Sequence, residues 1–328
     1  MAAGLLLPAE HDDVTAFAAR AESLGYESLW ASELWGRDAF VTLTTAAEQT
    51  ETLDLGTAIV NVYGRSPATL AQAAATLAGA ASGRVRLGLG TSTAKAVTDL
   101  HGMAFDNPPR RLHETVELVK LFLDGDDRVT YDGQVFQVAD FPPLDQSIPV
   151  YAAALGAANR RATGRVADGW LPHNIPFEKL AATYETVAET ASDAGRDRSE
   201  ISVVPYVPCA VSEDTDEAVT TVRNHLAYYV GSSEGYENAV ALSFPDQAAR
   251  IAAAWRDGDR DAARNAVTDE MMGQLAIVGR PSEARMQFES LAARDVVDDV
   301  IVTIPLGASR DLRERTVREL APSSRDRC

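Results

Sequence analysis

Four segments of the chain combine residue types that can bind a ligand or move a proton. Residues 30–38 read Trp-Ala-Ser-Glu-Leu-Trp-Gly-Arg-Asp, and such a mixture of aromatic and ionisable side chains is typical of a pocket. Residues 61–67, Asn-Val-Tyr-Gly-Arg-Ser-Pro, end in a serine cap and a proline, which predicts the start of a helix. In 88–95, Gly-Leu-Gly-Thr-Ser-Thr-Ala-Lys, small residues allow a ligand to approach closely, and Lys95 could meet an anion. The small residues of 152–159 would open a helix, whose free backbone N–H groups suit an anion.

Each segment also has a purely structural interpretation. Gly88 and Gly90 could serve packing between strands, and they lack the third glycine and the following acid of a dinucleotide-binding fingerprint. Glu33 could form an ion pair with the nearby Arg37 as readily as it could transfer a proton. Taken singly, the segments favour structure over function. Their joint position after predicted strands favours a site.

Short apolar runs alternate with longer amphipathic patterns from end to end of the chain. This alternation predicts parallel strands connected by crossover helices. The number of runs suits a closed (β/α)8 TIM barrel better than an open sheet, and a barrel carries its active site at the carboxyl ends of its strands. The candidate strands are 4–7, 28–31, 55–60, 85–89, 150–153, 169–171, 202–211 and 300–304.

Two regions depart from this alternation of predicted strands and helices. Residues 129–141 predict a small hairpin with Asp132-Gly133 as its turn. Residues 232–279 are long and mostly helical, and they precede the last strand–helix unit. Neither region reads as a linker and no internal repeat is present, so we expect a single domain over residues 1–328.

The composition excludes several classes of protein. The net charge is −18, with 48 acidic and 30 basic residues, which opposes binding to nucleic acid or to an anionic membrane surface. No run approaches the roughly 20 apolar residues of a membrane span, and the first ten residues lack a secretory signal pattern. We therefore expect a cytoplasmic protein. The two cysteines have no metal-ligand spacing and exclude a disulfide framework, so no metal is expected.

The basic residues are almost all arginine, since Lys95, Lys120 and Lys179 are the only lysines. An acidic, lysine-poor chain resembles the proteins of salt-loving archaea, because molar salt screens self-repulsion and makes a high net charge tolerable. An ordinary acidic protein from a GC-rich genome, which also favours arginine, is the alternative. We favour the halophilic interpretation.

Four stretches together resemble the luciferase-like monooxygenase superfamily. They are LGYESLWASELWGRDAF at 24–40, LGTAIVNVYGRSPATLAQAAATLAGAASGRVRLGLGTS at 55–92, PVYAAALGAANRRATGRVADGW at 149–170 and VTDEMMGQLAIVGRPSEARMQF at 267–288. Within the superfamily, NVYGRSPATLA is most similar to the archaeal deazaflavin branch. That branch includes methylenetetrahydromethanopterin reductase and secondary alcohol dehydrogenases that use coenzyme F420.

The resemblance implies a barrel that holds the tricyclic ring of the cofactor at the strand ends. It implies a non-proline cis peptide bond at Ala58–Ile59 behind the ring and a phosphate site in the loop 154–158. The cofactor-binding residues that it implies are Ala58, Ile59, Asn61, Gly90, Thr91, Ser92, Lys95, Ala154, Gly156, Ala157 and Ala158.

The sequence also departs from the superfamily pattern. Relatives often carry an Asp-His pair where this chain has Glu33 and Leu34, so the resemblance implies no mechanism that needs an imidazole at this position. Relatives of the pterin reductase type carry an acid where this chain has Thr-Ala-Lys at 93–95, so a pterin substrate does not follow. Glu33 becomes the candidate proton donor or acceptor, and Trp35 would wall the pocket.

Two histidines also follow predicted strands. His11 stands beside two aspartates and fits a solvated loop better than a pocket. His173 could line the pocket or could simply end a strand. Neither lies in a segment that relatives use for ring and substrate contacts, as Glu33 does.

The leading interpretation is a coenzyme F420-dependent oxidoreductase that transfers a hydride to or from a small organic substrate. The acidic, lysine-poor composition supports the deazaflavin, since salt-loving archaea generally make it. One alternative is an FMN-dependent luciferase-like monooxygenase, and another is a barrel that stores a flavin without catalysis. We expect a small-molecule substrate and a homo-oligomer, either a dimer or a tetramer.

Overall fold

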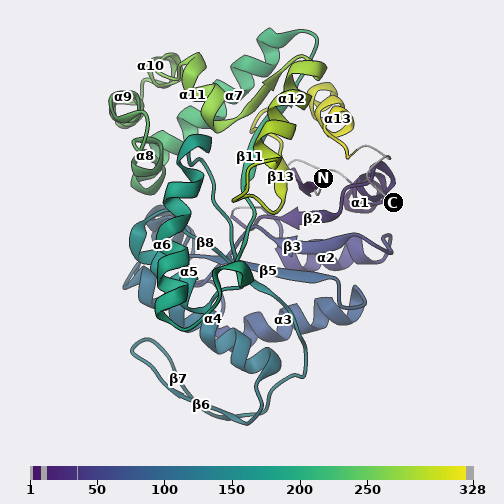
Figure 1. Ribbon diagram of the computed structural model, residues 1–328, viewed down its shortest axis with the longest axis vertical. Coiled ribbons are helices and arrows are strands. Elements are labelled where there is room, and N and C mark those ends of the chain that lie inside the picture. The colour runs from purple at the N-terminus through teal and green to yellow at the C-terminus, as the bar shows by residue number, and fades with distance from the viewer. Residues whose placement is uncertain (1–2, 9–12, 35, 323–328) are drawn as a thin grey trace.

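The chain forms a curled parallel β-sheet with helices on its outer side (Figure 1). The computed structural model describes residues 3–8, 13–34 and 36–322. Each of the predicted strand runs contains a strand of this sheet, so the predicted alternation of strand and helix is confirmed. The strands of the sheet are β1 (Ala3–Leu6), β2 (Ser28–Ala31), β3 (Asp54–Thr57), β4 (Val60–Asn61), β5 (Val85–Gly90), β8 (Val150–Ala153), β9 (Gly169–Trp170), β10 (Ser202–Val203), β11 (Tyr206–Val211), β12 (Ile277–Gly279) and β13 (Val300–Thr303).

Neighbouring strands follow the order β10-β9-β8-β5-β3-β2-β1-β13-β11-β12, with β4 beside β5. The seventh predicted strand, 202–211, is split in two: β10 pairs with β9, whereas β11 pairs with β13. Strand β12 falls in the region predicted as mostly helical. It forms because Cys209, Ala210 and Val211 extend beyond the pairing with β13, and β12 supplies partners for their backbone groups.

The third predicted strand is interrupted at the Ala58–Ile59 peptide bond, which is cis as the resemblance implied. Before this bond, β3 pairs with both β2 and β5. After it, β4 pairs with β5, and the carbonyl of Ile59 accepts a hydrogen bond from the backbone N–H of Glu33 at 3.2 Å. The break therefore turns this segment toward the end of β5 and the loop after β2.

Helices connect the strands, and local signals define their ends. Gly25, at a φ of 90°, ends the first helix, and Ser66 caps the third by accepting a bond from the N–H of Thr69. None of the described helices is long and apolar enough to cross a membrane. The α-helices are α1 (Val14–Leu24), α2 (Ala39–Ala47), α3 (Pro67–Ala80), α4 (Pro108–Asp124), α5 (Ala157–Val166), α6 (Leu180–Asp193), α7 (Thr215–Ser232), α8 (Glu234–Val240), α9 (Pro245–Arg256), α10 (Arg260–Asn265), α11 (Asp269–Leu275), α12 (Pro281–Ala292) and α13 (Arg310–Glu319).

The predicted hairpin exists as β6 (Val129–Asp132) and β7 (Gln137–Phe141), and it projects below α4 in Figure 1. Its turn is not the predicted Asp132-Gly133 pair, because Asp132 still pairs with Gln137 and the turn spans residues 133–136. The buried carboxylate of Glu114 accepts the backbone N–H groups of residues 134–136 at 2.8–3.0 Å. These long-range hydrogen bonds to Glu114, and not a local two-residue turn, determine the conformation of the loop.

The inner side of the curled sheet is filled by large side chains set against small ones. A Cβ atom on Gly56 would lie 2.3 Å from the ring of Trp30, closer than real contacts allow, so a glycine is required there. The Trp30 ring meets Tyr151 edge-on, with their centroids 5.9 Å apart. The cluster comprises Trp30, Ala58, Tyr151, Leu171, Val204 and Ile301, with Leu6, Ile59, Ala153 and Tyr206 only partly buried against it.

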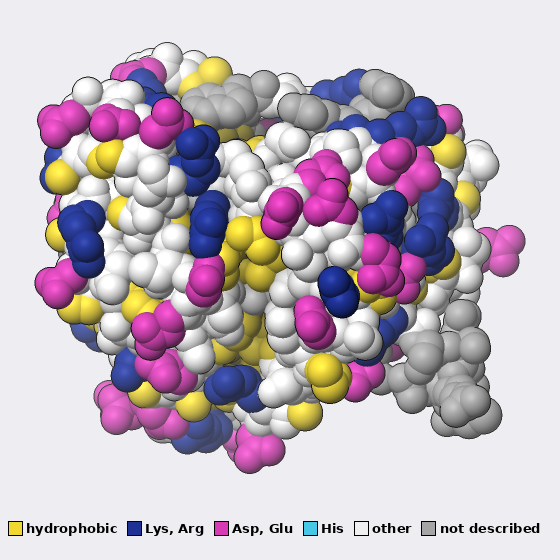
Figure 2. Space-filling model, turned by 90° about the horizontal axis from the view of Figure 1, so that it is seen from above, with side chains coloured by type: hydrophobic (Ala, Val, Ile, Leu, Met, Phe, Trp, Pro, Cys, Tyr) yellow, Lys and Arg dark blue, Asp and Glu magenta, His cyan; other side chains and the backbone are white. Residues whose placement is uncertain are grey.

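Charged side chains of both signs are interspersed on the outer surface, as the face in Figure 2 shows. Acidic residues outnumber basic ones, 48 to 30. The surface charge is therefore spread out rather than gathered into one basic or acidic patch on that face.

Candidate active site

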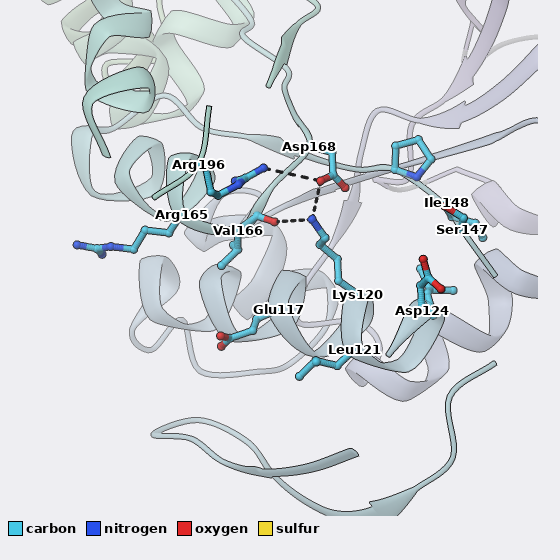
Figure 3. A pocket seen from close by; sticks show the side chains of 12 residues that line it. Glu117, Lys120, Leu121, Asp124, Ser147, Ile148, Arg165, Val166, Asp168 and Arg196 are labelled. Atoms are coloured by element: carbon cyan, nitrogen blue, oxygen red, sulfur yellow. Dashed lines mark hydrogen bonds and ion pairs between the residues drawn. The ribbon is translucent and has the colours of Figure 1, made fainter. Parts of the chain in front are cut away.

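The carboxyl ends of parallel strands lie on one side of the sheet, and the segments that follow them meet there. A surface hollow of about 580 Å³ lies at the opposite, amino end of β8. Figure 3 shows its ion pairs: Asp168 contacts Lys120 at 2.5 Å and Arg196 at 3.8 Å. Asp168 also accepts the backbone N–H of Val150 at 2.9 Å. These contacts connect the ends of helices to the start of a strand, which is a structural role. We therefore place the candidate site at the carboxyl ends of the strands.

An apolar floor lies at those ends, beside the cis peptide bond. A Cβ atom on Gly90 would lie 3.0 Å from the side chain of Ile59 and 3.4 Å from Cβ of Ala153. Ile59, Gly90 and Ala153 therefore meet, and the glycine permits their approach. Three predicted features, the break after β3, the end of β5 and the end of β8, are brought together by this contact.

Asn61 comes two residues after Ile59 of the floor, and its side chain makes hydrogen bonds within the protein. Its side-chain oxygen accepts the backbone N–H groups of Tyr63 and Gly64 at 2.9 and 2.6 Å. Its amide nitrogen therefore faces Nε2 of His101 at 3.0 Å and donates to it. This bond ties the segment after β5 to the end of β4.

Glu33 lies after β2, at the same side of the sheet, and its partner differs from the one considered from the sequence. Its carboxylate is bound by the guanidinium of Arg65 through bonds of 2.5 and 3.0 Å, not by Arg37. The N–H of Ala39 donates to the same carboxylate at 3.0 Å, and Asp38 also contacts Arg65. Arg65 is the partner of Glu33 because the segment that carries Arg65 is folded over the end of β2. Arg37 is close to Glu33 only in the sequence. Trp35 lies outside the described residues, as does His11.

The segment after β5 is shaped by local contacts. Ser92 adopts a left-handed conformation, with a φ of 57°. Lys95, considered as an anion ligand, instead contacts Asp99 at 2.5 Å on the surface, where both side chains are more than half exposed. Thr91 is buried, and its hydroxyl accepts a weak bond from the amide of Asn159 at 3.4 Å.

The loop 154–158 opens α5, as predicted. Gly156 is the cap residue, no described side chain caps the helix, and the residues 156–158 are exposed. Ala154 is buried, and its carbonyl accepts the indole N–H of Trp170. The side-chain oxygen of Asn159 is buried without a partner among the described residues. The open helix start and this unpaired oxygen lie next to Thr91, so the two predicted segments form one surface.

A group of aromatic and imidazole rings also lies beyond these strand ends, next to β9, and the sequence indicated only one of its members. His173, beyond β9, stacks on Tyr206 at the start of β11, with their centroids 4.2 Å apart. Tyr229 and His225 of α7, and Tyr236 of α8, complete the group. The sequence signal that could have found them is the density of histidine and tyrosine in 225–236.

Burial keeps these rings uncharged. It lowers the pKa of His225 to about 3, and together with His225 it holds the pKa of His173 well below its ordinary value. Burial also raises the pKa values of Tyr206 and Tyr236, so both stay protonated. Among the described residues, no group of three or more histidines, cysteines or carboxylates could hold a metal ion.

The sequence profile of the luciferase-like monooxygenase family matches residues 2–298. The chain belongs to this family. A luciferase-like relative, 5,10-methylenetetrahydromethanopterin reductase of Methanolobus tindarius, is 28% identical over 300 residues, which are 90% of this chain and 91% of that protein. The reductase of the same name from Archaeoglobus fulgidus is 28% identical over 306 residues, with 88% and 89% covered.

A solved luciferase-like structure is also similar throughout. The coenzyme F420-dependent tetrahydromethanopterin reductase from Methanopyrus kandleri superposes with a TM-score of 0.82 at 26% sequence identity, covering 98% of this chain and 97% of that one. The curled sheet thus matches the fold of luciferase-like TIM-barrel proteins, and the chain is an enzyme of this family.

Proposed function

We propose that this luciferase-like enzyme is a coenzyme F420-dependent oxidoreductase that transfers a hydride to or from a small organic substrate. The observation that carries the proposal is the apolar floor of Ile59, Gly90 and Ala153 beside the cis peptide bond, because a flat ring needs such a surface. The relatives named above as reductases, one of them as F420-dependent, agree with this assignment.

The residues present fit a deazaflavin at this position. Gly90 keeps the floor level, because a Cβ atom there would press on Ile59, and the buried oxygen of Asn159 needs a donor. The open start of α5 offers backbone N–H groups to a phosphate. The bound deazaflavin would supply or accept the hydride. The residues proposed to hold its ring are Ala58, Ile59, Asn61, Gly90, Thr91 and Ser92, and those proposed for its phosphate are Ala154, Gly156, Ala157 and Ala158, with Lys95 available once it releases Asp99.

The chain's own residues position the reactants and exclude water. Glu33 remains the proposed proton donor or acceptor, and Trp35 the proposed wall of the pocket. The carboxylate of Glu33 is half of an ion pair, so it would act from a position held by Arg65. The proposal thus makes Arg65 a positioning residue.

We also propose that the sheet closes into a complete (β/α)8 barrel within one domain, 1–328. The two-residue step from β10 to β11, at 204–205, would carry the sheet from its β9 edge to its β13 edge. The bridge between His173 and Tyr206 supports this closure.

Cofactor titration tests the function. Purified protein is mixed with F420 and, separately, with FMN, and binding is followed by fluorescence and by absorbance, in which the oxidised deazaflavin and FMN differ. Tight F420 binding with weak FMN binding is expected. The family description names monooxygenases, so an FMN-dependent monooxygenase is the second candidate, and tight FMN binding without F420 binding would replace the proposal by that one. Binding of either cofactor without turnover of any alcohol or carbonyl would support a storage protein.

A further inference from the structure

The rings of His173, Tyr206, His225, Tyr229 and Tyr236 form one contiguous group. Tyr229 lies 4.7 Å from both histidine rings, and its ring is 4.9 Å from that of Tyr236, measured between centroids. The hydroxyl of Tyr236 bonds to Nδ1 of His173 at 3.2 Å. We call these five residues the ring cluster.

The ring cluster faces the candidate site. Tyr206 packs against the inner cluster of the sheet, as Leu171 and Ile301 do. Side chains alternate between the two faces of a strand, so His173, two residues after Leu171, and Thr303, two residues after Ile301, also face inward. The parallel bridge between His173 and Tyr206 continues the sheet to this point. The ring cluster thus lies at the same carboxyl ends as the floor, because β9, which His173 follows, pairs with β8, which ends at Ala153.

Two ring nitrogens of the ring cluster lack a hydrogen-bond partner. The N–H of Leu306 donates to Nδ1 of His225 at 3.1 Å, so the proton of this neutral imidazole is on Nε2, where it has no acceptor among the described residues. Nε2 of His173 is also unpaired within the described chain, whichever way the Tyr236 bond is directed. The Thr303 hydroxyl is a third such group. Native proteins rarely leave such buried groups unpaired, so each points to a partner from outside the chain.

The charge of this partner follows from its surroundings. Both histidines are neutral, and neither a carboxylate nor a lysine or arginine of the described chain contributes to their pKa shifts. A charged ligand group would therefore be buried without a counterion, which costs several kcal/mol. An uncharged oxygen accepts a hydrogen bond without this penalty. Tyr206, Tyr229 and Tyr236 are partly exposed, so the ring cluster reaches the protein surface.

We propose that the ring cluster binds the uncharged oxygen-bearing end of the substrate, a carbonyl or hydroxyl group, through His173, His225 and the hydroxyl of Tyr206. The inference rests on the proposed function only in naming the bound molecule as substrate. It assigns the ring cluster to substrate recognition, and it excludes substrates that would place a carboxylate or an ammonium group here.

Nuclear magnetic resonance of ¹⁵N-histidine-labelled protein tests the proposal directly. Butan-2-one and butan-2-ol are the neutral probes, and pyruvate is the anionic probe of similar size to butan-2-one. Each is titrated with and without F420. The neutral probes should shift the Nε2 resonances of His173 and His225 saturably, whereas pyruvate should leave them unchanged. If no neutral probe shifts them, or if pyruvate shifts them equally, the proposal is overturned and the two nitrogens are held by water or packing alone.

Variants locate the binding. Tyr206→Phe removes one donor and keeps the stacked ring, and His173→Asn removes Nε2 while keeping an acceptor near Tyr236. Each variant should bind the neutral probes with about three- to tenfold lower affinity, as expected for the loss of one hydrogen bond. Tyr228→Phe is the matched control, because Tyr228 contacts Trp255 and lies at the edge of the group. Unchanged affinity in Tyr206→Phe and His173→Asn would overturn the proposal.

The two proposals can fail separately. F420 binding is measured by fluorescence on the same samples. If the neutral probes bind and F420 does not, the ring cluster is a ligand site but the proposed function is wrong. If F420 binds and the neutral probes do not, the function stands and the substrate is recognised elsewhere.

Discussion

Glu33 and Arg65, 32 positions apart in the chain, form a two-point ion pair in which each carboxylate oxygen contacts one guanidinium nitrogen. Both side chains are mostly buried, with 13% and 17% of their surfaces exposed. The pair joins the segment after β2 to the start of α3, and it holds the carboxylate that is proposed to transfer a proton.

Replacing Glu33 by glutamine separates a catalytic from a structural role. The change keeps the shape and removes the charge, and general acid–base catalysis contributes about 10²–10⁴-fold. We expect turnover to fall at least about 100-fold, with nearly unchanged F420 affinity. Steady-state kinetics with whichever substrate turns over, and F420 titration, are the measurements. Asp38→Asn is the control, since Asp38 also contacts Arg65 and asparagine can still cap α2. Equal turnover in the two variants would make the ion pair purely structural.

Gly90 should tolerate no branched side chain. In Gly90→Val, the added atoms would press on Ile59 and Ala153 and raise the floor on which the ring is proposed to lie. We expect a loss of about 1–3 kcal/mol of unfolding free energy and at least tenfold weaker F420 binding. Gly79→Ala is the control, because Gly79 has open space around it in α3 and should leave F420 binding unchanged. If Gly90→Val binds F420 as wild type does, the floor is not the ring site.

Asp299 should make stability depend on pH in the neutral range. It is 6% exposed beside Arg86, and burial outweighs the arginine and raises its pKa to about 7. Between the ordinary value of about 3.8 and 7, the folded state binds a proton that the unfolded state has lost. Its stabilising contribution is therefore complete below that range and is lost as pH rises through 7.

Asp299→Asn stays neutral and lacks this dependence. The unfolding free energy of the variant relative to wild type should rise between pH 4.5 and 8, by about 3 kcal/mol. Denaturant melts across that range measure it. Asp295→Asn, at an exposed position, serves as the control and should show no such trend. A constant difference between Asp299→Asn and wild type would show that Asp299 ionises normally.

The excess of negative charge should make folding depend on salt. Screening at molar KCl reduces the repulsion that accompanies a net charge of −18, so the melting temperature should rise with KCl. Thermal melts at low and at molar KCl test this, with sucrose as an uncharged additive for comparison. Equal melting temperatures at both KCl concentrations would contradict the halophilic interpretation.

The sequence by itself determined the strand and helix order, because apolar periodicity reports directly which residues face a core. It also determined several helix ends, such as Gly25 and Ser66, since caps act over a few residues. Resemblance located the cis bond at Ala58–Ile59, and the small-residue loop of Gly156 predicted the open start of α5.

Only the tertiary structure decided which distant residues meet. Arg65 replaced Arg37 as the partner of Glu33, and Glu114 reshaped the turn after Asp132, because these partners are set by how the segments fold over one another. The ring cluster of His173, Tyr206 and their neighbours depends on the split of residues 202–211 into two strands and on the position of α7. Local periodicity carries no information on such contacts, since the curl and register of a sheet are fixed by packing across the whole chain.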